Sequence, residues 1–219
     1  FLDALAYTGY DVQAQKNDGT LYKKFGGAMA GSPVLSGITY GVSSSGTETV
    51  ASGSTPTGKA PNIAAFRSGG LVCGSYVAYV YYNYLPNIKG VDTSKYPMPS
   101  NLKSAPSWKT ATDGWIASGK ARSIDFTVNS DGSNFKPAEE IPIGSIIFFT
   151  GVNTGGIPHV AIYAGYYNGN HFLTHVGNDR GPEIVTVNGM TKGGQPEAVA
   201  KIVVPNLVEE FGAIEVHKK

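Results

Sequence analysis

The chain has 219 residues, of which 41% are hydrophobic and 15% are charged, and its formal net charge is +1. A chain of this length can bury a full core as one domain without disulfides or metals. The near-neutral charge excludes the electrostatic footprint of a nucleic-acid-binding protein, and no apolar stretch reaches the ~18 residues of a membrane span. The single cysteine, Cys73, excludes an intrachain disulfide.

The first third of the chain predicts a helical extension and then a polar loop. Residues 2–15 are rich in Ala and Leu and predict a helix, which the turn residues Asn17-Asp18-Gly19 should end. Residues 41–60 are mainly Ser, Gly and Thr, which is typical of a long surface loop. The start at Phe1 shows no signal-peptide pattern, so we expect a processed product or a fragment.

The middle of the chain predicts two helices. The first begins after Gly70 and should end at Pro86, because apolar residues recur on one helical face, namely Cys73, Val77, Val80 and Tyr84. Residues 87–107 contain several prolines and should be largely irregular. Ser107 is the expected N-cap of a short second helix that carries Trp108 and Trp115.

The last third predicts strands. Apolar or alternating runs occupy residues 145–149, 159–163, 171–176, 184–187 and 198–204, and Gly and Asn separate most of them. This spacing is typical of antiparallel hairpins. Helices followed by strands predict an α+β domain.

Cys73 stands where the first of these helices begins. The positive end of the helix dipole favours the thiolate form, which is the nucleophile. His159 opens a predicted strand and can act as its base. His171 and His175 share one face of the next strand, and either could orient the ring of His159. His217 lies in a charged C-terminal stretch and is expected to be a solvated bystander.

Four segments resemble the NlpC/P60 family of cell-wall cysteine peptidases. They are Gly70-Leu71-Val72-Cys73-Gly74-Ser75-Tyr76-Val77, Ile143-Gly144-Ser145-Ile146-Ile147-Phe148-Phe149, Pro158-His159-Val160-Ala161-Ile162-Tyr163-Ala164-Gly165 and Gly37-Ile38-Thr39-Tyr40-Gly41. The third segment is the most specific, and the resemblance spans roughly residues 36–187. It implies a papain-like fold in which the cysteine helix packs on an antiparallel sheet.

The resemblance also implies an activity. Family members cleave peptidoglycan stem peptides, commonly between D-γ-glutamate and the diamino acid, without a cofactor or a metal. Cys73 would attack the carbonyl, His159 would transfer the proton, and His175 would be the third catalytic residue. Tyr40 and Ser75 would contact the substrate. The sequence departs from the family at Val72-Cys73-Gly74-Ser75, where Asp-Cys-Ser-Gly is usual, so specificity is expected to differ.

The resemblance and composition together suggest an organisation and a location. Residues 1–35 would form a helical extension, residues 36–210 the catalytic domain with insertions near 42–65 and 87–107, and residues 211–219 a tail. The protein would be secreted to the extracellular cell wall, and other domains of a longer surface protein are possible partners.

Three alternatives stay open. A CHAP-like N-acetylmuramoyl-L-alanine amidase keeps the order Cys then His, and Asn178 or Asp179 could be its third residue. A metal site could use Cys73 with the histidines, since thiolate and imidazole bind zinc. A non-catalytic cell-surface binding module would not need a reactive thiol.

Overall fold

A computed structural model describes residues 12–15, 21–25, 72–88, 90–151, 156–167, 169–177, 181–192 and 195–210. The helical elements are α2 (Cys73–Tyr79), η2 (Val80–Tyr84), α3 (Leu85–Ile88), α4 (Ala105–Ala117) and η3 (Val187–Gly189). The strands are β1 (Val12–Gln15), β2 (Leu21–Phe25), β3 (Ala121–Ser123), β4 (Phe126–Thr127), β5 (Lys136–Pro137), β6 (Ile146–Gly151), β7 (His159–Tyr167), β8 (Asn170–Gly177), β9 (Gly181–Thr186), β10 (Thr191–Lys192) and β11 (Gln195–Pro205). The expected α+β class is confirmed.

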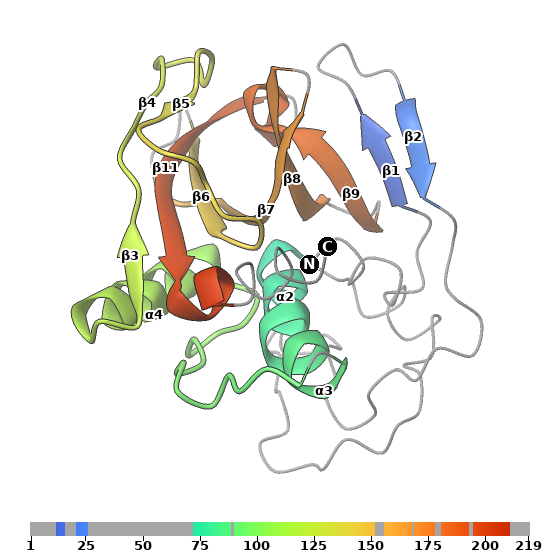
Figure 1. The fold of residues 1–219 in the computed structure, drawn as a ribbon. Coiled ribbons are helices and arrows are strands. Elements are labelled where there is room, and N and C mark those ends of the chain that lie inside the picture. The colour runs from blue at the N-terminus through green and yellow to red at the C-terminus, as the bar shows by residue number, and fades with distance from the viewer. Residues whose placement is uncertain are drawn as a thin grey trace.

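The strands form a nine-stranded sheet with the order β10-β11-β6-β7-β8-β9-β1-β2, and β3 pairs with β11 (Figure 1). Strands β6, β7, β8 and β9 pair antiparallel with one another in chain order, and β11 returns to pair antiparallel with β6. The strands predicted from residue 145 onward are all present. Few residues separate β7 from β8 and β8 from β9, and antiparallel strands can be joined by such short connections.

The N-terminal prediction is wrong where it can be compared. Residues 12–15 form β1 rather than the end of a helix, and Asn17-Asp18-Gly19 lies between β1 and β2, which pair antiparallel. An Asp-Gly turn between short strands is typical of a hairpin, so the turn signal was assigned to the wrong element. Residues 2–11 lie outside the described residues. Strand β1 also pairs parallel with β9, a contact between segments far apart in sequence.

The first predicted helix is longer than expected. Elements α2, η2 and α3 follow one another without a break, so Pro86 lies inside the helical path instead of ending it. A proline within a helix cannot donate the usual backbone hydrogen bond to the residue four positions before it, so the regular α-helical pattern has to change near Pro86. The wider π-helical turn of η2 directly precedes α3.

Helix α4 begins earlier than expected. Its N-cap is Ser104, whose side chain accepts a hydrogen bond from the backbone N–H of Ser107 at 3.3 Å, and Pro106 occupies its first turn. Ser107 is therefore inside the helix rather than its cap. Both Ser104 and Ser107 precede the tryptophans, and only the backbone path shows which of them is extended.

The sheet separates two apolar clusters. The helix-side cluster joins α2, η2 and α4 to alternate residues of β6, β7 and β8; its sheet members include Ile146, Phe148, Val160, Ile162 and Val176. The far-side cluster contains the residues that alternate with them, including Ile147, Phe149, Ala161, Tyr163 and Leu173. Both faces of the central strands are therefore buried, which fits their nearly continuous apolar sequences.

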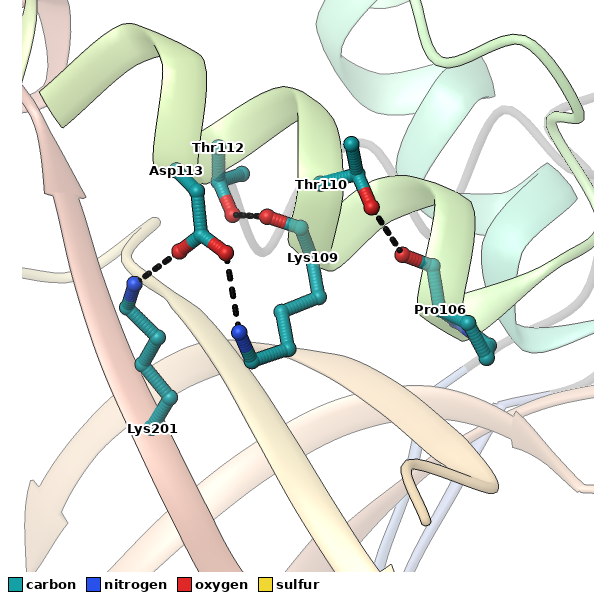
Figure 2. Close-up of polar contacts among 6 residues, drawn as sticks. All are labelled: Pro106, Lys109, Thr110, Thr112, Asp113 and Lys201. Atoms are coloured by element: carbon teal, nitrogen blue, oxygen red, sulfur yellow. Dashed lines mark hydrogen bonds and ion pairs between the residues drawn. The ribbon is translucent and has the colours of Figure 1, made fainter. Parts of the chain in front are cut away.

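Polar contacts attach α4 to the sheet (Figure 2). Asp113 of α4 pairs with Lys201 of β11 and, one helical turn away, with Lys109 at 2.8 Å. Burial opposes ionisation of Asp113, but hydrogen bonds from the two lysines outweigh it and lower the pKa of the carboxyl.

The long apolar helix that would be needed to cross a membrane does not occur in the described part of the chain.

Candidate active site

Cys73 is the first residue of α2 and is half-buried against the helix-side cluster. The preceding residue, Val72, is extended and supplies no side-chain cap, while its carbonyl accepts the backbone N–H of Tyr76 at 3.0 Å. The first turn carries no acidic side chain. An uncapped first turn leaves its amide dipoles directed at the N-terminal end, which favours an anionic sulfur there.

The structure brings two of the predicted residues into direct contact. His159 Nε2 lies 2.9 Å from His175 Nδ1, and the two rings meet nearly edge to face, at 82° with centroids 4.9 Å apart. His159 is 6% exposed and His175 is 5% exposed. A hydrogen bond between two neutral imidazoles requires one to donate and the other to accept, so the contact couples their tautomers.

Strand register explains why these two histidines meet. Ile162 of β7 is opposite Thr174 of β8, so His159 and His175 lie at the same end of the strand pair and on the same face. On the other side of β7, His159 is opposite Phe149, whose ring centroid lies 6.1 Å from that of His159. The pair is therefore held between neighbouring strands in an apolar setting.

His171 has a different partner. Its Nδ1 lies 2.8 Å from the hydroxyl of Tyr163, and its ring packs against Phe135 and Tyr166. Partial burial lowers the pKa of His171, which favours the neutral ring that can accept the phenolic hydrogen. The structure thus places His175, and not His171, beside His159.

Helix α2 packs on β7 and β8, the strands that carry the histidine pair. Figure 1 shows the N-terminal end of α2 nearest the sheet and α3 farther from it. The Tyr76 hydroxyl reaches Thr174 at 3.2 Å, which places Thr174 on the helix side of the sheet. By alternation, His175 faces the other side, and His159 shares that side. Any contact between the Cys73 thiol and the His159 imidazole would therefore form around the end of β7, where His159 is the first residue.

The remaining predicted residues divide into two groups. Ser75 is fully buried within α2. Tyr40, Asn178 and Asp179 lie outside the described residues, as do the insertion near residues 42–65 and the tail at residues 211–219. Among the described residues, no group of three or more His, Cys, Asp or Glu side chains is arranged to hold a metal ion.

Sequence reasoning missed two features around the candidate site. The first is the Tyr76–Thr174 hydrogen bond, which no local sequence pattern indicates because 98 positions separate its partners. The second is the contact of the first turn of α2 with a distant loop: a Cβ on Gly74 would lie 2.2 Å from the Leu102 carbonyl oxygen. The glycine directly after Cys73 was the available signal.

Comparison with known proteins adds no relative: no protein-family model, no curated protein and no solved structure matches this chain.

Proposed function

We propose that this protein is a papain-like cysteine endopeptidase of the NlpC/P60 kind, which cleaves peptidoglycan stem peptides in the extracellular cell wall. The observation that carries the proposal is the buried His159–His175 pair at the end of β7 and β8, the two strands on which the helix that begins with the only cysteine packs. Nucleophilic catalysis by a thiol needs a base and a group that orients the base. A second histidine that fixes the tautomer of the first supplies that group.

The chemistry follows from the tautomer that the pair allows. When His159 Nε2 donates to His175 Nδ1, the other nitrogen of His159 is the one that accepts a proton. It takes the thiol proton of Cys73, and the sulfur attacks the peptide carbonyl carbon. The C–N bond then breaks as His159 returns the proton to the leaving amine. Water, deprotonated by His159, hydrolyses the thioester and releases the carboxylate product.

Mass spectrometry of purified muropeptides tests the proposal. We expect the wild type to produce fragments cut after D-γ-glutamate, and Cys73→Ala and His159→Ala to produce none. His175→Ala should lower the cleavage rate by about 10²-fold or more, because His159 loses its orienting partner. His171→Asn should stay within about threefold of the wild type, since its partner is Tyr163.

Other products would assign the protein differently. Cysteine-dependent cleavage between the sugar lactate and L-Ala would move it to the amidase class of the CHAP-like alternative. Intact muropeptides in every sample would overturn the peptidase proposal and leave the cell-surface binding module. Equal losses in His171→Asn and His175→Ala would contradict the assignment of the third residue.

A further inference from the structure

The contact between α2 and β8 includes one specific polar bond. Tyr76 follows Cys73 by three residues, so the two side chains lie on neighbouring turns of one helical face. The Tyr76 hydroxyl donates to Thr174 Oγ1 at 3.2 Å. Tyr76 is 0% exposed and Thr174 is 2% exposed. A hydrogen bond between two side chains this deeply buried fixes geometry, because neither partner can turn to water instead.

Both ends of this bond adjoin the candidate catalytic residues. Thr174 immediately precedes His175 in β8, and it is opposite Ile162 in β7. The bond therefore fixes the position of α2, which carries Cys73, relative to β7 and β8, which carry the two histidines. Burial raises the pKa of Tyr76, so its phenol stays protonated and remains the donor throughout the working pH range.

We infer that Tyr76 is a positioning residue, whose bond to Thr174 holds Cys73 at the distance from His159 that proton transfer requires. This inference rests on the proposed function. The thiol must meet the imidazole around the end of β7, so small displacements of α2 relative to β8 change their separation directly. Reacting groups lose much of their rate when they are misplaced by about 1 Å.

The chain offers a matched control in the same helical path. Tyr82 of η2 is also buried, and its hydroxyl donates to the Pro97 carbonyl at 3.2 Å, a length equal to that of the Tyr76 bond. Tyr82→Phe removes a tyrosine hydrogen bond that ties the helix to a loop rather than to β8. A purely structural role for these hydroxyls predicts the same outcome for Tyr76→Phe and Tyr82→Phe.

The experiment measures two quantities on the folded protein. The first is the rate at which iodoacetamide alkylates Cys73 as a function of pH, which is specific because the chain has one cysteine. The second is kcat and KM for muropeptide cleavage. We expect Tyr76→Phe and Thr174→Val each to lower kcat roughly tenfold with KM within about twofold of the wild type. Both should also shift the alkylation inflection toward that of an ordinary thiol.

The double variant and the control decide the interpretation. Tyr76→Phe combined with Thr174→Val should be no worse than either change alone, since both remove one bond. Tyr82→Phe should keep the wild-type kcat and alkylation profile within about twofold. Additive losses in the double variant, or equal losses in Tyr76→Phe and Tyr82→Phe, would overturn the inference. Thr174→Val keeps the test decisive if Tyr76→Phe does not fold.

Failure of the inference can be told apart from failure of the proposed function. A wild-type protein with an ordinary thiol profile and no cysteine-dependent cleavage would overturn both. A wild-type protein with an activated thiol, together with an unchanged Tyr76→Phe variant, would overturn the positioning role alone.

Discussion

Gly74 shows how a single residue shapes the surroundings of the candidate nucleophile. A Cβ built at this position would lie 2.2 Å from the Leu102 carbonyl oxygen and 2.8 Å from that of Lys103. The obstructing atoms are backbone, and the Leu102 carbonyl also accepts the indole N–H of Trp108 at 2.9 Å. The loop before α4 can therefore lie against the first turn of α2 only because residue 74 has no side chain.

We expect Gly74→Ala to lower the free energy of unfolding by about 1–3 kcal/mol, since the loop or the helix must move to admit the methyl group. Gly114→Ala is the matched control. Gly114 also lies in a helix, and a Cβ there would meet nothing within 4 Å, so alanine should be neutral or stabilising by up to about 1 kcal/mol. Urea unfolding of both variants measures the difference. Equal free energies of unfolding for the two variants would show that the loop before α4 can move to admit the methyl group without loss of stability.

At the scale of elements, the charged contacts of α4 show which interactions hold one element on another. Asp113 accepts from Lys109 within its own helix and from Lys201 of β11, 88 positions away. The Lys201 side chain is 21% exposed, whereas that of Lys109 is 39% exposed. Charges that are less exposed interact in a medium of lower effective dielectric, so the contact between elements should matter more than the contact within the helix.

This comparison yields a prediction for two lysine substitutions. Lys201→Met should lower the free energy of unfolding by about 0.5–1 kcal/mol, and Lys109→Met by about 0.3 kcal/mol or less. Methionine keeps most of the apolar stem, so the loss reports mainly the charge. Denaturant titrations in low salt and in about 1 M salt measure both values, and the gap between them should narrow in high salt. A larger loss for Lys109→Met would reverse the proposed order.

Across the molecule, contacts between segments far apart in sequence attach the start of the C-terminal region to the segment that packs on α4. Tyr96, in the segment between α3 and α4, packs its ring against Trp115 with centroids 5.1 Å apart. Its hydroxyl oxygen accepts the backbone N–H of Leu207 at 3.0 Å, across 111 positions. This bond attaches the helical turn at residues 206–210, which follows β11, to the helix-side cluster, of which Tyr96 and Trp115 are members.

Tyr96→Phe keeps the ring and removes only the acceptor of the Leu207 N–H. Leu207 is 2% exposed, so its backbone donor would be left buried, and we expect a loss of about 1–3 kcal/mol in the free energy of unfolding. Fluorescence of Trp108 and Trp115, the only two tryptophans, reports the transition. Hydrogen exchange at Leu207 should rise in the variant. Unchanged exchange there would show that the hydroxyl is not what protects this amide.

Features that depend on neighbouring residues could be predicted from the sequence alone. Apolar alternation located β6 to β9 and β11, and helical periodicity located the element that begins at Cys73. Where local signals suited two outcomes, they misled: Pro86 is compatible with a helix end or with a helical path that contains a π-helical turn, and Asn17-Asp18-Gly19 with a helix end or a hairpin.

Which distant side chains meet could be learned only from the folded chain. Alternation along the strand places both His171 and His175 on the same face of β8. The register between β7 and β8 then makes His175, and not His171, the neighbour of His159. The approach of a loop to Gly74 likewise depends on how two elements pack. Periodicity along a chain specifies which face of an element is buried, but register and packing between elements specify the partner, because they are set by contacts far apart in sequence.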